Sequence, residues 1–144
     1  MEALKMFTPV SMRSANSYRN VGLETSVSMA NPHQLVSMLF DALLQSLSAA
    51  KGAISSGDIP AKGRAISRAV RILEEGLKAG LDEERGGELA ANLRGLYDYC
   101  IFKITDANLK NNAAFVDEVI RLVQPVADSW SAIKSEVALQ SKAS

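Results

Sequence analysis

The chain has 144 residues, 47% of them hydrophobic, and its 16 basic and 16 acidic side chains cancel to a formal net charge of zero. This composition is typical of one folded domain, and the lack of a basic excess argues against a nucleic-acid-binding protein. A single cysteine excludes an intrachain disulfide. No apolar run approaches the length of a membrane span, and the first residues lack a hydrophobic leader. We therefore expect a cytoplasmic protein without membrane insertion.

The first 30 residues are rich in Ser, Thr and Asn and carry scattered apolar side chains without a helical period. We predict a flexible N-terminal arm over 1–30 and one folded domain over 31–144. Tyr18 is an aromatic side chain within this polar segment. We expect it either to anchor the arm on the domain or to hold a partner.

Four helical patterns follow the arm. Asn31, Pro32 and Gln34 form a helix start with a capping box, and Asp58 and Asn112 are the caps expected for the second and fourth helices. The predicted helices cover 32–55, 60–80, 87–110 and 113–139, with a kink at Pro125. Long helices joined by short turns predict an all-α fold, an antiparallel up-and-down four-helix bundle.

The third predicted helix is apolar on two sides. At 100° per residue one stripe faces inward, and from it we expect Leu93, Leu96 and Cys100 to be buried. The full inward stripe is Leu89, Leu93, Leu96, Cys100, Ile104 and Ala107. Phe102 and Leu109 point to the opposite side. Such a helix either lies between neighbours on both sides or offers one side to a partner.

The first helix also has a wide apolar arc, which Phe40, Leu44 and Leu47 extend round one flank. Two interpretations stay open: a thick bundle buries all of these side chains, or they line a groove for a partner's amphipathic segments. The candidate partner-binding residues are Tyr18, Phe40, Leu44, Leu47, Phe102 and Leu109.

The residues offer little catalytic chemistry. The one histidine, His33, falls in the first turn of a helix, where a capping or surface role is favoured. No phosphate-binding loop, metal-ligand cluster or nucleophile motif is present in the sequence, so we predict neither an enzyme nor a cofactor or metal site. Arg64, Arg68 and Arg71 share one face of the second helix. A solvated face is the favoured interpretation and a partner patch the alternative.

Two motifs together carry a resemblance. Residues 32–41 read PHQLVSMLFD, and residues 86–99 read GGELAANLRGLYDY. With Tyr18 before them and Trp130 after them, they resemble the FliS family of flagellin-specific export chaperones. The LYDY stretch with its GGE lead-in is the most specific part. Phe40 stands where the family usually has tyrosine, which keeps the ring and loses the hydroxyl.

This resemblance implies a four-helix bundle that binds the disordered C-terminal segment of flagellin. The client would stay monomeric in the cytoplasm and be delivered to the flagellar export gate. The resemblance also implies that the bound segment wraps along the bundle and that the arm can occupy part of the same surface. The residues leave monomer and weak homodimer open. From the pattern alone, the alternative is a self-associating helical adaptor without a flagellin client.

Overall fold

The computed structural model describes the backbone of residues 31–143 and the side chains as far as Ile133. The predicted arm, including Tyr18, lies outside the described residues. Within them the chain forms α3 (Pro32–Ser56), α4 (Ile59–Arg71), the π-helical segment η2 (Ile72–Lys78), α5 (Glu83–Lys110) and α6 (Ala113–Ala143). Because α4 continues directly into η2, the described chain makes four rods, and the predicted all-α fold is confirmed.

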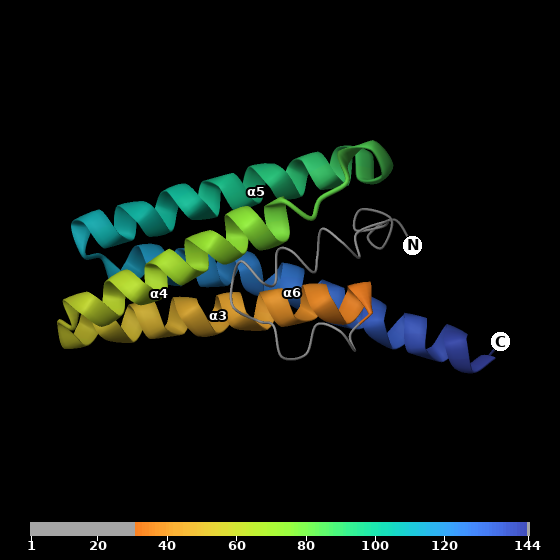
Figure 1. The fold of residues 1–144 in the computed structure, drawn as a ribbon, viewed down its shortest axis with the longest axis horizontal. Helices are drawn as coiled ribbons and strands as arrows, with labels where there is room; N and C mark the ends of the chain where they lie inside the picture. The colour runs from red at the N-terminus through yellow and green to blue at the C-terminus, as the bar shows by residue number, and fades with distance from the viewer. Residues whose placement is uncertain (1–30, 144) are drawn as a thin grey trace.

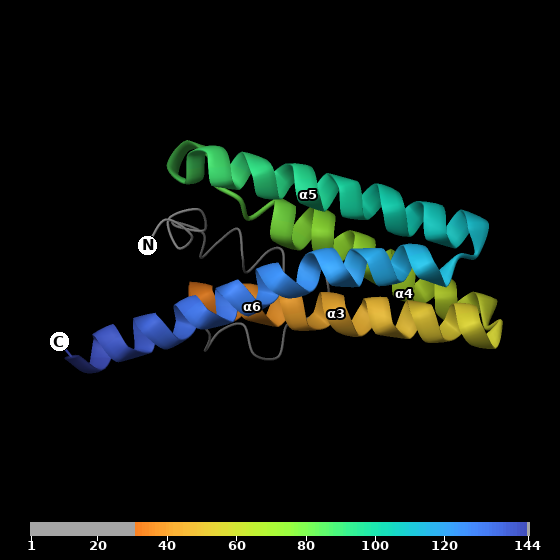
Figure 2. The same cartoon turned by 180° about the vertical axis from the view of Figure 1, so that it is seen from behind.

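Successive helices run in alternating directions, as an up-and-down bundle requires (Figure 1). Helix α3 packs against α4, η2 and α6, and α5 packs against α4, η2 and α6. The helices α3 and α5 therefore stand diagonally across the bundle. Figure 2 shows the same arrangement from behind, with α6 lying along α3. Both views show α5 and α6 diverging toward the end of the bundle where α5 begins.

The predicted caps of α3 and α4 are confirmed. The Asn31 side chain accepts a hydrogen bond from the Gln34 backbone N–H at 2.8 Å, and the Gln34 side chain accepts one from the Asn31 N–H at 3.0 Å. This capping box pairs two backbone donors that the helix itself leaves unpaired. Helix α3 ends at Gly57, which has a φ of 74°. Asp58 then accepts a hydrogen bond from the Ala61 N–H and starts α4.

Helix α5 begins four residues earlier than predicted. Asp82 caps a first turn by accepting a hydrogen bond from the Arg85 N–H at 3.2 Å. The backbone then leaves helical geometry at Gly87, where φ is 55° and ψ is −131°. Only glycine adopts this conformation readily. The predicted start at residue 87 therefore marks the regular part of the helix, and the extra turn lies before a kink.

The π-helical turn at the end of the second rod was not predicted. It widens the helix so that two adjacent pairs, Ile72 with Leu73 and Gly76 with Leu77, are all buried. A Cβ on Gly76 would lie 2.8 Å from Cδ2 of the buried Leu39 side chain, so glycine permits α3 to approach here. At the other end, Ile59 was expected on the inner stripe but is 71% exposed, because it lies in the first turn of α4.

The fourth helix follows its prediction closely. The Asn112 side chain accepts a hydrogen bond from the Ala114 N–H at 2.9 Å. Helix α6 then continues through Pro125 without a break. Pro125 lies on the exposed side of α6, where the carbonyl that loses its partner can be hydrated. The expectation that the proline does not break the helix is therefore confirmed, and the kink expected at Pro125 stays a prediction.

One contact locks the start of α3 to α6 and corrects the expectation for His33. The His33 ring is buried and stacks on the Trp130 ring, with centroids 4.6 Å apart and planes 5° from parallel. The His33 Nε2 lies 2.8 Å from the Trp130 carbonyl oxygen, and the Trp130 indole N–H donates to the His33 carbonyl at 3.0 Å. His33 is thus a packing residue and not a surface one.

The core stripe of α5 also needs correction. Cys100 is buried as predicted, but Leu93 and Leu96 are only half-buried and Leu89 is 43% exposed. The inner face is instead made by Ala90, Tyr97, Cys100, Ile104 and Ala107. Tyr97 is 1% exposed. The three leucines lie in the first half of α5, where that helix diverges from α6 and is less covered (Figure 1).

Candidate partner-binding surface

The outer face of α5, which we define by Phe102 and Leu109, exposes two large apolar side chains. Phe102 is 65% exposed and Leu109 is 83% exposed. They are seven residues apart, so they lie on one side of the helix and about 10 Å apart along its axis. The inner side chain Ile104 is fully buried on the opposite side. The sequence prediction that Phe102 and Leu109 lie away from the core is confirmed.

Polar contacts bind α5 to α6 along one border of this face. The Tyr99 hydroxyl donates a hydrogen bond to the Glu118 carboxylate, and this bond raises the pKa of Tyr99. The Lys103 ammonium lies 3.9 Å from the same carboxylate and 3.9 Å from the centre of the Phe115 ring. Phe115 is therefore covered by a cation and does not add to the exposed apolar face.

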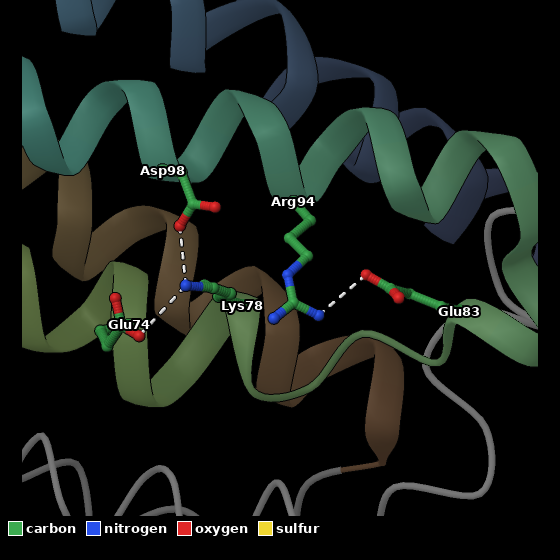
Figure 3. A network of polar contacts seen from close by, with 5 residues as sticks. All are labelled: Glu74, Lys78, Glu83, Arg94 and Asp98. Atoms are coloured by element: carbon green, nitrogen blue, oxygen red, sulfur yellow. Dashed lines mark hydrogen bonds and ion pairs between the residues drawn. The ribbon is translucent and has the colours of Figure 1, made fainter.

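The other border of the outer face is made by ion pairs between α5 and the second rod. The Lys78 ammonium lies 2.7 Å from Asp98 on α5 and 3.2 Å from Glu74 on its own rod (Figure 3). These two contacts raise the pKa of Lys78, with Asp98 the larger cause. Arg94 pairs with Glu83 at 3.0 Å, across the kink at Gly87 (Figure 3). Charged groups thus frame an apolar face.

The candidate residues on α3 have a different position. Phe40 and Leu47 are 3% and 1% exposed, so the bundle buries them, as the first of the two interpretations expected. Leu44 is half-buried and packs against the core. Because α3 and α5 are diagonal, the structure does not bring Leu44 into one groove with Phe102 and Leu109. A partner that touches both helices has to pass round the bundle.

The one histidine, His33, and the one cysteine, Cys100, are both buried in the bundle. Burial raises the pKa of the Cys100 thiol to about 12, so the thiol is protonated near neutral pH. Among the described residues, no group of three or more histidines, cysteines or carboxylates is placed to hold a metal ion. The same part of the chain contains no helix that is both long and apolar enough to cross a membrane.

Sequence reasoning missed two exposed apolar side chains, Ile59 and Leu89, because it placed both on inner stripes. Periodicity identifies which residues share a side of a helix. It does not show how far along that helix the neighbouring helices extend. Ile59 occupies the first turn of α4, and Leu89 follows the kink in α5. The only signals were the position of Ile59 at a helix start and that of Leu89 within one turn of Gly87.

The sequence is similar to those of known flagellar proteins. A family model described as "Flagellar protein FliS" matches residues 14–137. The flagellar secretion chaperone FliS of Salmonella typhimurium is 44% identical over 124 residues, which cover 86% of this chain and 92% of the relative. The flagellar secretion chaperone FliSB of Pseudomonas aeruginosa is 42% identical over 122 residues, covering 85% and 96%. FliS of Bacillus subtilis is 32% identical over 114 residues, covering 78% and 84%.

Proposed function

The chain belongs to the FliS family of flagellar secretion chaperones, and on that premise we propose that its client is the disordered C-terminal segment of flagellin. Binding takes place in the cytoplasm, prevents premature polymerisation and assists delivery to the flagellar type III export gate. The protein acts by binding and not as an enzyme. The chaperone name of the relatives and the exposed face of α5 both support this proposal.

The observation that carries the proposal is the exposure of Phe102 and Leu109, the two most exposed large apolar side chains of α5. Two large apolar side chains on one line of a helix are a typical anchor pair for an amphipathic or extended segment. Their separation of about 10 Å matches client side chains seven residues apart in a helix. It equally matches side chains about three residues apart in an extended strand.

A disordered client suits a surface of this kind. The client loses chain entropy when it binds, so it needs many dispersed contacts and gains modest affinity for each unit of area. The charged borders on both sides of the outer face of α5 keep the free protein hydrated without covering Phe102 or Leu109. Covering one terminal segment of flagellin is sufficient to block assembly if polymerisation needs that segment.

Replacing both anchors tests the proposal. We expect Phe102→Ser with Leu109→Ser to change the free energy of unfolding by less than about 1 kcal/mol, because both positions are exposed. Affinity for the isolated flagellin C-terminal segment should fall at least tenfold. Two apolar anchors at ~1.5–3 kcal/mol each exceed the 1.4 kcal/mol that one decade requires. Calorimetry and a thermal melt of the same variant measure the two effects.

Ile59→Ser is the matched control, because Ile59 has a similar exposure on a different helix. It should leave client affinity unchanged. Unfolding of the double variant would mean that Phe102 and Leu109 are structural. Unchanged affinity in a stable double variant would remove the outer face of α5 from the client site.

The alternative is a bundle that self-associates through the same face, and the exposure of Phe102 and Leu109 would serve that equally well. Sedimentation of the free protein over a range of concentrations distinguishes the two. A client surface predicts that added flagellin segment forms a one-to-one complex. A self-associating bundle predicts a dimer that the double serine variant dissociates and that the flagellin segment does not affect.

A further inference from the structure

A concave surface lies on the seam between α3 and α4, away from the outer face of α5. It has a volume of about 340 Å³. We call it the α3–α4 groove, and its lining residues are Gln45, Ser46, Ala49, Ala61, Arg64, Ala65 and Arg68. The proposed client contact at Phe102 and Leu109 uses none of these residues.

The floor of the α3–α4 groove is made of small side chains. Ala49, Ala61 and Ala65 leave room for another backbone to approach closely. Ser46 also lines the groove but is only 4% exposed, and its hydroxyl oxygen is out of reach of solvent and has no hydrogen-bond partner among the described residues. The alanines therefore make the surface that a partner would contact.

The rim of the groove carries two cations that pair with no acidic side chain among the described residues. Arg64 and Arg68 are exposed and four residues apart on α4, so they lie on the same side of the helix. Neither makes an ion pair with a described residue, whereas Arg71, one turn further on, lies 3.4 Å from Glu75. Two guanidinium groups in register present forked donors suited to carboxylates.

We propose that the α3–α4 groove binds an acidic amphipathic helix of a partner protein. Two carboxylates four residues apart on the partner pair with Arg64 and Arg68. Its small apolar side chains lie on the alanine floor. A protein partner is favoured over a nucleic acid because the whole chain has no basic excess. The groove and the outer face of α5 are separate, so both can be occupied together.

A synthetic probe tests the proposal without knowledge of the natural partner. The probe is an alanine-rich helical peptide with glutamate pairs four residues apart, and the reference peptide has glutamine at those positions. Fluorescence anisotropy with the full chain should show at least tenfold tighter binding of the glutamate peptide, weakening as salt rises. Equal affinity for the two peptides overturns the proposal. So does tighter binding of a single-stranded oligonucleotide than of the glutamate peptide.

Three variants locate the site. Arg68→Glu removes one cation, and Ala49→Phe fills the groove from an exposed position. Each should lower the affinity for the glutamate peptide at least tenfold and leave the melting temperature unchanged. Arg121→Glu is the control, because Arg121 is exposed on α6 and makes no ion pair with a described residue. It should alter peptide affinity less than twofold. A loss with Arg121→Glu as large as that with Arg68→Glu, or no loss with Ala49→Phe, contradicts the proposal.

The same variants separate this site from the client site. Arg68→Glu and Ala49→Phe should bind the flagellin C-terminal segment with wild-type affinity. The double serine variant at Phe102 and Leu109 should bind the glutamate peptide with wild-type affinity. If Arg68→Glu lowered the affinity for both ligands equally, the groove would be part of the client-binding surface and not an independent site.

Discussion

The two faces of α5 are similar in composition and opposite in environment. The inner face places Tyr97, Cys100 and Ile104 in the core of the bundle with no more than 1% exposure. The outer face leaves Phe102 and Leu109 largely in water. Apolar side chains along one helix therefore serve two different purposes. Those of the inner face stabilise the fold, and those of the outer face leave an exposed apolar surface that the fold does not need.

Truncation of the inner face should have the largest effect. Ile104→Ala should lower the free energy of unfolding by ~2–5 kcal/mol, because the side chain is fully buried and leaves a cavity. Phe102→Ala should change it by about 0.5 kcal/mol or less. Leu96→Ala should fall between them, since Leu96 is half-buried. Chemical denaturation of the three variants checks this order, and equal losses at 102 and 104 would erase the distinction between the faces.

Gly87 fixes where the regular part of α5 begins and hence how its faces are oriented. Gly87→Ala should cost about 1–3 kcal/mol, because a side chain at a φ of 55° and a ψ of −131° is strained. Open space surrounds the position where the Cβ would stand, so the cost comes from the backbone and not from a clash. Gly95→Ala, in the regular helix with similar open space, should be neutral or stabilising. A melt of each variant makes the comparison.

Alkaline pH should lower the free energy of unfolding through the buried titratable side chains of the inner face. Burial raises the pKa of Cys100 from 9.0 to about 12 and raises that of Tyr97 as well. Above pH 9 the unfolded thiol loses its proton while the folded thiol keeps it, so stability falls as pH rises from 9 toward 12. The loss assigned to Cys100 should be about 2 kcal/mol between pH 9 and pH 11.

Comparison with Cys100→Ala measures that loss. The variant should be less stable at neutral pH because it removes a buried sulfur, but its stability should fall less steeply between pH 9 and pH 11. Urea denaturation at a series of pH values gives both slopes. Parallel slopes for the variant and the wild type would show that Cys100 is not held protonated by burial.

The smallest expected effect is at the Tyr97 hydroxyl. This group is buried and has no hydrogen-bond partner in the part of the chain that the structure describes. Tyr97→Phe keeps the ring and removes the unpaired oxygen, so it should leave the protein as stable as before or stabilise it by up to about 1 kcal/mol. A loss above 1 kcal/mol would reveal an ordered water on the hydroxyl. Differential scanning calorimetry resolves a change of this size.

Much of the fold was predictable because it is encoded locally. Caps such as Asn31 and Asp58 act within three residues, and a long stripe of period 3.6 defines each helix. The stacking of His33 on Trp130 was not predictable, because the two residues are 97 positions apart in the sequence. The π-helical turn was missed for a related reason, since close approach of Leu39 to Gly76 is a tertiary contact.

The candidate site was predictable in part. The angular position of Phe102 and Leu109 on the third helix was enough to place them outside the core. The same reasoning could not separate Leu96 from Tyr97, which lie in neighbouring sectors, because the depth of burial depends on how α5 and α6 diverge. Nor could it show that the bundle buries Phe40 and Leu47, since a wide apolar arc is compatible with a second neighbour or with a groove.

Site-specific crosslinking tests the central claim most directly. A photo-reactive phenylalanine analogue is placed in turn at positions 102, 109 and 59, all of which are exposed, so the fold is retained. Irradiation with the flagellin C-terminal segment should yield a covalent adduct with the analogue at position 102 and at position 109, and none with it at position 59 on α4. Undiminished binding with adducts at position 59 and none at 102 or 109 would contradict the assignment of the outer face of α5 to the client.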